Sequence, residues 1–215
     1  MGKGRIRRLG VVDLHRLPST CPACPLGPGH QPGLDPRNQE IAAWARAADA
    51  DWGFSGLGIV QGDRVVAYVL LAPPLHVPRV GPQSGFGLNP DAAVVMALRV
   101  LPAYAGSGLG RQLIQGAAAR MTRTPFEALE ARGAPGATPG ACCIPPAGFL
   151  EAVGFTVIDP HPAHPRYRLD LARTVRWMPD LRPAVDRVLD WVRPLPPAPA
   201  GRTHQRRGVR LGSAP

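Results

Sequence analysis

The chain has 215 residues, a hydrophobic content of 45% and a formal net charge of +10. This length and composition fit one globular domain with a sizeable core and additional tails, rather than a disordered chain. The longest apolar stretch, about a dozen residues from Val65 to Leu75, is too short to span a bilayer. Asp13 interrupts the only short apolar run near the N-terminus, so we expect no secretory signal and a cytoplasmic protein.

Most of the positive charge is at the two ends of the chain. Residues 1–16 and 201–215 each carry a net charge of +4, which leaves only +2 for the residues between them. A nearly neutral body argues against a nucleic-acid-binding face on the fold. Basic tails bind nucleic acid weakly, and most are simply solvated. We therefore expect no nucleic-acid partner beyond weak tail contacts, and no membrane partner.

The four cysteines form two different patterns. Cys21 and Cys24 form a C-x-x-C pair, whereas Cys142 and Cys143 are adjacent. Structural zinc sites usually take ligands from two C-x-x-C-like knuckles, and adjacent cysteines point apart. We therefore expect no metal and favour small packing residues. An interaction module in which Cys21 and Cys24 bind a metal remains an alternative.

In chain order, the hydrophobic spacing and the turn residues predict strands alternating with helices. The segment 1–9 is expected to be a basic tail, and Gly62-Asp63 a tight hairpin turn. Strands are expected at 9–14, 57–61, 64–72, 92–100, 126–131, 155–158 and 167–171. Helices are expected at 39–48, 108–121, 146–153 and 181–192. This order predicts an α/β (α+β) fold, with one domain over 10–172, a C-terminal helical extension over 173–193 and a disordered basic tail over 194–215.

The glycine-rich turn after the expected strand 92–100 is the segment most indicative of chemistry. Gly106, Gly108 and Gly110 alternate with other residues immediately before a predicted helix. Such glycines allow backbone N–H groups at a helix N-terminus to approach a phosphate closely. The turn is not a P-loop, because Arg111 and Gln112 follow Gly110, and its spacing differs from a dinucleotide fingerprint. A glycine-rich turn without a ligand also remains possible.

Residues 98–113, LRVLPAYAGSGLGRQL, resemble the acyl-CoA-binding motif of the GNAT acetyltransferase superfamily. Residues 149–155, FLEAVGF, are similar to the F-Y-E-x-x-G-F signature of the same superfamily. The resemblance extends over residues 57–171. Arginine provides 24 of the 25 basic residues, which is also similar to an uncharacterised actinobacterial branch. The resemblance implies a mixed, mostly antiparallel sheet flanked by helices.

The resemblance also implies a reaction, in which an acetyl group passes from acetyl-CoA to a primary amine by direct attack in a ternary complex. The end of the strand would separate from its neighbour and bind the pantetheine arm, and the following loop would bind the pyrophosphate. The amide of Val100 would stabilise the oxyanion. The implied cofactor-binding residues are Leu98, Arg99, Val100, Ala105, Gly106, Ser107, Gly108, Leu109, Gly110 and Arg111.

The sequence departs from the superfamily pattern at three positions. Ala105 occupies the position of an Arg or Gln at the loop start, and Cys143 the position of an Asn. Leu150 replaces the Tyr that often protonates the departing thiolate. This last replacement motivates an alternative function as a non-catalytic CoA-binding regulatory module.

The attacking amine must first lose a proton, which costs roughly 4–5 kcal/mol at pH 7 for a pKa near ~10.4. Candidate bases are Asp91, Glu130 and His76. Segments 21–52 and 76–90 are expected to determine acceptor specificity. The acceptor is expected to be a small-molecule or protein amine, and the protein a monomer or homodimer.

Overall fold

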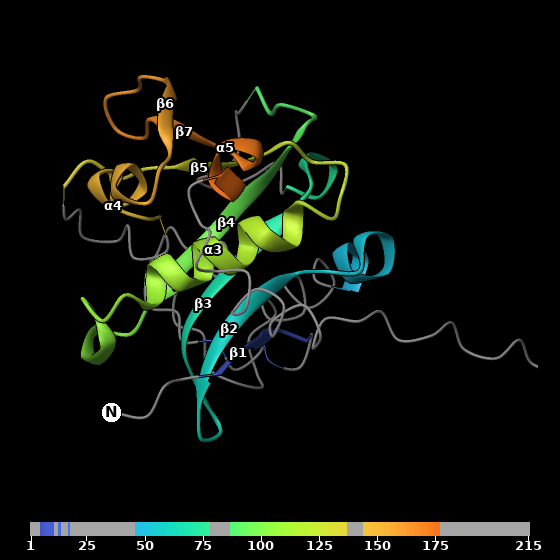
Figure 1. Cartoon of the computed structure of the whole chain (residues 1–215), viewed down its shortest axis with the longest axis vertical. Coiled ribbons are helices and arrows are strands. Elements are labelled where there is room, and N and C mark those ends of the chain that lie inside the picture. The colour runs from blue at the N-terminus through green and yellow to red at the C-terminus, as the bar shows by residue number, and fades with distance from the viewer. Residues whose placement is uncertain are drawn as a thin grey trace, which may run out of the picture.

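The computed structural model describes residues 5–10, 13, 17, 46–77, 87–136 and 144–176. In these residues a seven-stranded sheet has the order β1-β2-β3-β4-β5-β7-β6 (Figure 1). Neighbouring strands are antiparallel except β4 and β5, which are parallel. The predicted fold class is therefore confirmed. The strands are β1 (Arg5–Arg8), β2 (Gly56–Gln61), β3 (Arg64–Ala72), β4 (Ala92–Val100), β5 (Ala128–Arg132), β6 (Thr156–Asp159) and β7 (Arg166–Asp170).

Helices flank this sheet, and α3 lies across one of its faces (Figure 1). Residues 46–52 are helical, and so overlap the end of the helix predicted at 39–48. The predicted helix at 181–192 and the tail at 194–215 lie outside the described residues. The named helices are α3 (Leu109–Met121), α4 (Ala147–Ala152) and α5 (Leu171–Arg176), with short 3-10 turns η1 (Pro74–His76) and η2 (Pro102–Tyr104). The short helix α5 begins at Leu171, the last residue of the strand predicted at 167–171, and continues into the segment 173–193 for which a helical extension is predicted.

The β2–β3 hairpin confirms the clearest local prediction. Gln61 pairs with Arg64, and Gly62 between them has a φ of +61°. A residue with a side chain rarely adopts this left-handed conformation, so glycine permits the two-residue turn.

The N-terminal strand lies earlier than predicted. The sequence predicts a strand at 9–14 after a tail, but β1 occupies residues 5–8 of that tail and pairs with β2. Two of the three arginines of β1 have carboxylate partners: Arg7 pairs with Asp13, and Arg8 with Asp49. Leu9 follows the strand as a fully buried core residue. Of the strand predicted at 9–14, only residues 9, 10 and 13 are described, and Leu9 and Gly10 are not in a strand.

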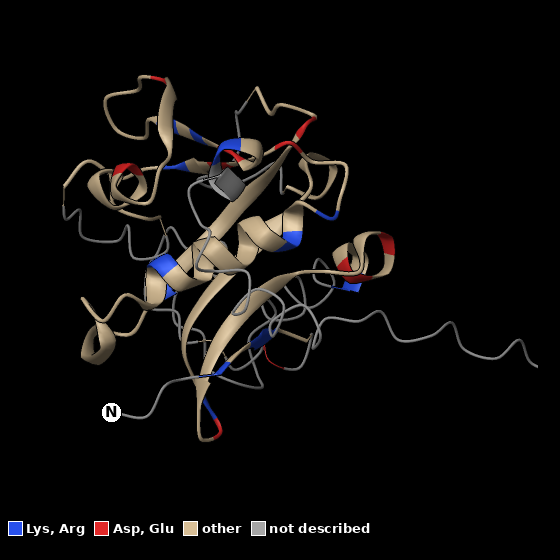
Figure 2. Ribbon diagram, viewed as in Figure 1, with Lys and Arg blue, Asp and Glu red and all other residues tan. Residues whose placement is uncertain are grey.

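Each face of the sheet has its own apolar core. On the face of α3, Leu113 and Ile114 of the helix pack among Leu57, Val69 and Val95 of the strands. On the other face, a second cluster includes Tyr68, Leu70, Val94 and Met96. Figure 2 shows the corresponding charge distribution: β3, β4 and the middle of α3 carry few charges, whereas both signs occur together over β5 and β7.

The close approach of α3 to the sheet depends on a glycine. A Cβ on Gly116 would lie 3.0 Å from Ile6 Cδ1 and 3.1 Å from Leu57 Cδ1. A side chain there would separate the helix from β1 and β2. No helix in the described part of the chain combines the length and the apolar character needed to cross a membrane.

Candidate functional site

The parallel strands β4 and β5 separate halfway along β4. Their pairing runs from Ala92–Ala128 to Val95–Ala131 and stops there, although β4 continues to Val100. Among the residues that the structure describes, the last five of β4 therefore have a strand neighbour only on the side of β3. A backbone edge opens in the middle of the sheet.

A β-bulge marks the point of separation. Leu70 of β3 is opposite Ala97, whereas the next residue, Leu71, is opposite Val95. Met96 is thus the extra residue of the bulge. A bulge bends its strand and increases the local twist, which explains why β4 turns away from β5 at this residue.

The peptide groups that face the open edge follow from the strand register. The Leu101 N–H donates to the Val66 carbonyl at 3.0 Å, which places the peptide groups of Leu101 and Arg99 toward β3. Because successive peptide groups alternate in direction, those of Leu98 and Val100 point toward the open edge. The resemblance implies three cofactor-binding residues in this strand. The peptide groups of Leu98 and Val100 point toward the open edge, whereas that of Arg99 points toward β3.

The loop after β4 leads directly into α3. Gly106 and Gly108 have φ values of +73° and +80°, and Gly108 immediately precedes the helix without any side-chain cap. A Cβ on either glycine would meet no heavy atom within 4 Å. Glycine is therefore favoured at these two positions by the backbone conformation and not by close packing. The loop is exposed from Ala105 to Gly108.

Five amides of this loop remain available. Ala105 N–H donates to the Pro102 carbonyl, and Ser107 N–H to the Tyr104 carbonyl at 3.4 Å. The Ser107 hydroxyl also donates to the Tyr104 carbonyl. Within the described part of the chain, no acceptor is found for the amides of Gly106, Gly108, Leu109, Gly110 and Arg111. These donors, at the positive end of a 13-residue helix, suit an anionic oxygen.

Helix α4 supports the start of α3. A Cβ on Gly110 would lie 3.1 Å from Phe149 Cε2, so the absence of a side chain allows the aromatic ring to approach the helix. Arg111 Nη2 donates to the Ala152 carbonyl at 2.8 Å, at the end of α4. The two motifs of the sequence thus meet in space. The Arg111 guanidinium is thus bonded to α4, and the group that Arg111 offers to a ligand of the loop is its backbone amide.

Leu150 is a core residue. Its exposed fraction is 0%, and it packs within the cluster under α3. Gly154, with a φ of +101°, ends the predicted helix and is followed by the buried Phe155. The position of the superfamily tyrosine therefore holds an apolar side chain that faces the core.

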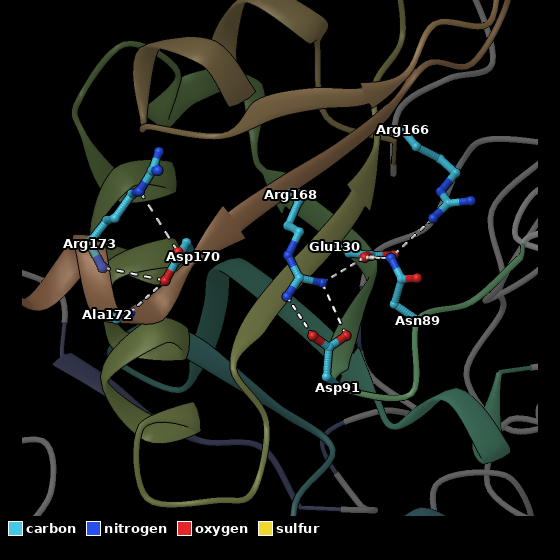
Figure 3. Close-up of polar contacts among 8 residues, drawn as sticks. All are labelled: Asn89, Asp91, Glu130, Arg166, Arg168, Asp170, Ala172 and Arg173. Atoms are coloured by element: carbon cyan, nitrogen blue, oxygen red, sulfur yellow. Dashed lines mark hydrogen bonds and ion pairs between the residues drawn. The ribbon is translucent and has the colours of Figure 1, made fainter.

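Asp91 is bound to an arginine that the sequence analysis did not select. Arg168 Nη2 donates to Asp91 Oδ2 at 2.6 Å, and Nη1 to Oδ1 at 3.1 Å (Figure 3). These hydrogen bonds, with the charge of Arg168, hold the pKa of Asp91 below its ordinary value despite partial desolvation. A carboxylate with a lowered pKa is a weak proton acceptor.

Glu130 is almost completely buried, with an exposed fraction of 1%. It accepts hydrogen bonds from Arg168 at 3.2 Å and from Asn89, and pairs with Arg166 at 3.5 Å (Figure 3). Both predicted carboxylates therefore belong to one ionic cluster over β5 and β7. The sequence analysis predicted the strand 167–171, which contains Arg168, but gave no signal that this arginine meets the two carboxylates.

His76 and the four cysteines, the other residues considered in the sequence analysis, do not belong to this ionic cluster in the described part of the chain. His76, in η1 beyond the end of β3, has its Nε2 3.3 Å from Asp51 Oδ2. The four cysteines lie outside the described residues. In the part of the chain that is described, no three His, Cys, Asp or Glu side chains gather as a metal site would require.

Comparisons with known proteins bear on the fold and on the family. The fold is similar to the loading GNATL domain of CurA from Lyngbya majuscula (16% identity, 80% of this chain and 100% of that chain, TM-score 0.53). It is also similar to yncA from Salmonella typhimurium, solved with its cofactor acetyl-CoA (17% identity, 79% of this chain and 95% of that chain, TM-score 0.51). No curated protein matches the sequence significantly. The sequence model of the acetyltransferase (GNAT) family matches residues 14–137, more than half of the chain, and the protein therefore belongs to this family.

Proposed function

We propose that the protein transfers an acetyl group from acetyl-CoA to an amine. One observation supports this proposal above all: the open edge of β4 leads directly to the loop with five available amides. An extended chain that ends in a diphosphate fits this combination. The solved structure of yncA, with acetyl-CoA as its cofactor, supports the same choice of ligand.

In the proposed complex, the pantetheine arm adds to the sheet beside β4. The peptide groups of Leu98 and Val100 would pair with its amides, as a neighbouring strand does. The pyrophosphate would accept hydrogen bonds from the amides of Gly106 and of 108–111. Ser107 and Ala105 would shape the loop, because their own amides are already bonded within it.

The transfer then needs no enzyme nucleophile. The neutral amine attacks the thioester carbonyl, the new C–N bond forms, and the C–S bond breaks as the tetrahedral intermediate collapses. The amide of Leu98 or Val100 at the open edge would stabilise the oxyanion of that intermediate. The amine nitrogen loses one proton, and the coenzyme A thiolate gains one.

The ionic cluster limits how these protons move. Asp91 and Glu130 are engaged by Arg168, and the pKa of Asp91 is lowered, so we assign both carboxylates to positioning β4 and β5. Desolvation of the ammonium, with water as the proton acceptor, would generate the neutral amine. A thiol with a pKa near ~8.5 leaves as a thiolate without a donor, so the buried Leu150 does not prevent turnover.

A non-catalytic CoA-binding module is the second candidate function, favoured by Leu150 and by the engaged carboxylates. Two measurements separate it from the enzyme. Acetyl-CoA at ~100 times its dissociation constant should stabilise the fold by about 2.7 kcal/mol, or on the order of 5–10 °C in melting temperature. Thiol release from acetyl-CoA should then depend on an added amine. Absence of the thermal shift would contradict both functions, and a shift without thiol release would favour the module.

The cytoplasmic location and the actinobacterial branch stay predictions based on the composition.

A further inference from the structure

Helix α4 is too short to hold its own position. It contains only the six residues Ala147–Ala152, it has no side-chain cap, and Leu150 is its only buried residue. A helix of this length is not stable in isolation, so its place in the fold depends on contacts with other elements. The contacts of α4 therefore decide how it meets the start of α3.

Three consecutive residues of α4 contact three different parts of the protein. The ring of Phe149 approaches Gly110 of α3, and Leu150 packs into the core under α3. The carboxylate of Glu151 accepts a hydrogen bond of 3.0 Å from the hydroxyl of Tyr167 in β7. Successive residues of a helix lie about 100° apart around its axis. The three contacts together therefore fix the rotation of α4 about that axis.

The Tyr167 side chain is itself firmly packed. It is 2% exposed and belongs to the core under α3. A Cβ on Gly133, which follows β5, would lie 2.5 Å from Tyr167 Cε2, so the ring fills the space over this glycine. Burial and the hydrogen bond to Glu151 raise the pKa of Tyr167, so the hydroxyl keeps its proton and donates it to the carboxylate bond. Tyr167 is thus a fixed donor on the sheet, to which the exposed Glu151 is attached.

The end of α4 is also bonded to the start of α3. Arg111 Nη2 donates to the Ala152 carbonyl at 2.8 Å, and Ala152 follows Glu151 directly in the chain. The backbone of Arg111 carries the last of the five available amides of the loop. A bonded path therefore leads from Tyr167 in the sheet, through α4, to the proposed diphosphate site.

From this path we infer that Tyr167 is a positioning residue for the proposed coenzyme-binding loop. Its hydroxyl orients α4, and α4 in turn orients Arg111 and the first turn of α3 around the pyrophosphate. The inference rests on the proposed function, since it names a residue that prepares the same site. Tyr167 acts through Glu151 and takes no part in the transfer itself.

Tyr167→Phe tests the inference, because it removes only the hydroxyl and keeps the ring over Gly133. Glu151 is exposed, so water replaces the lost donor and we expect the fold to stay intact. A hydrogen bond of ordinary net strength corresponds to roughly a three- to tenfold change in an equilibrium constant. We expect the dissociation constant of coenzyme A and the KM for acetyl-CoA to rise by such a factor, with little change in kcat.

Matched variants separate positioning from a general effect on the fold. Glu151→Gln keeps an oxygen acceptor for the hydroxyl and should retain nearly the native affinity, whereas Glu151→Ala should weaken binding as Tyr167→Phe does. Tyr68→Phe is the control, because Tyr68 is 1% exposed but packs on the other face of the sheet. It should leave the affinity for coenzyme A unchanged. Full affinity in Tyr167→Phe, or an equal loss in Tyr68→Phe, would overturn the inference.

A double-mutant cycle tests the path itself. Arg111→Gln removes the guanidinium that bonds to the Ala152 carbonyl, and so interrupts the path between α4 and α3. If Tyr167 acts along this path, Tyr167→Phe should weaken coenzyme A binding less in the Arg111→Gln background than in the native protein. An undiminished effect in that background would contradict the inference.

Amide hydrogen exchange of the free protein gives a readout that needs no coenzyme. The Val153 amide at the end of α4 and the Gln112 amide in the first turn of α3 each donate to a carbonyl at 3.1 Å. Tyr167→Phe should accelerate the exchange of both amides by roughly three- to tenfold, because both elements lose a support, whereas Tyr68→Phe should change neither. Unchanged exchange in Tyr167→Phe would overturn the inference, even if the protein bound no coenzyme A. Faster exchange in a protein that binds no coenzyme A would contradict the proposed function instead.

Discussion

The guanidinium of Arg168 makes two hydrogen bonds to the carboxylate of Asp91, at 2.6 and 3.1 Å. This contact joins β7 to the residue that immediately precedes β4, across the intervening β5. The same guanidinium bonds to Glu130 of β5 at 3.2 Å. Arg168 therefore holds together the paired halves of β4 and β5, immediately before the two strands separate.

We expect Arg168→Gln to destabilise the fold strongly. The change leaves the buried Glu130 with fewer cationic partners, and removal of one member of a buried ion pair costs about 3–5 kcal/mol. Because Arg166 and Asn89 still bond to Glu130, we expect a loss toward the lower end of this range. Chemical denaturation measures the free energy of unfolding directly.

The double variant Arg168→Gln with Glu130→Gln serves as its control. Neutralising the carboxylate removes the uncompensated charge, so the double variant should recover part of the stability lost in the single variant. Equal stability of the two variants would mean that the pair contributes little.

The stability of the protein should also depend on pH through His164. The folded protein holds the pKa of His164 below its ordinary value of 6.5, through burial, Arg132 and His161. Below pH 6.5 the unfolded chain therefore binds a proton that the folded protein resists, and stability falls as the pH is lowered. Above pH 7 both states are neutral and the contribution disappears.

His164→Gln should flatten this dependence between pH 7.5 and 5.5, as followed by denaturant midpoints at fixed ionic strength. An unchanged slope near pH 6 in the His164 variant would contradict the assignment.

Asp91 affects stability in a lower pH range. Because its pKa is lowered in the folded state, its stabilising contribution is present above pH 3.8 and is lost as the pH falls below that value.

Local signals predicted the hairpin, β4 and α3, because each depends on residues adjacent in the chain. Gly62 determines the turn, and the spacing of apolar residues determines the buried face of α3. The separation of β4 from β5 could be expected only from the family resemblance. It depends on the bulge at Met96, which is a property of the register with β3.

The ionic cluster illustrates a second limit of the sequence. Asp91 and Arg168 are 77 positions apart, and nothing local indicates that they pair. The strand β1 shows how the same limit produced a wrong prediction. Its three arginines suggested a solvated tail, whereas in the structure Asp13 and Asp49 compensate two of them.

Restoring the superfamily tyrosine should not improve the protein. Leu150 has an exposed fraction of 0%, so Leu150→Tyr would place a larger, polar side chain in a packed core. Overpacking of this kind costs typically ~1–3 kcal/mol. We expect a lower denaturation midpoint and no increase in thiol release. A faster release at unchanged stability would show that the hydroxyl reaches the thiolate after all.

The proposed coenzyme-binding loop is tested most directly by Gly108→Val. At a φ of +80°, a β-branched side chain strains the backbone by roughly 1–2 kcal/mol, and its methyl groups add bulk in the open space beside the exposed loop, where the diphosphate is proposed to bind. We expect the thermal shift on addition of acetyl-CoA to be lost. Gly62→Val is the matched control, because Gly62 has a similar φ of +61° and also meets no heavy atom within 4 Å of a Cβ, but lies in the β2–β3 turn. Both variants should lose similar stability without ligand, while only the Gly62 variant keeps the shift. If the shift persists in the Gly108 variant, the diphosphate is not bound by this loop, since strain alone has been matched.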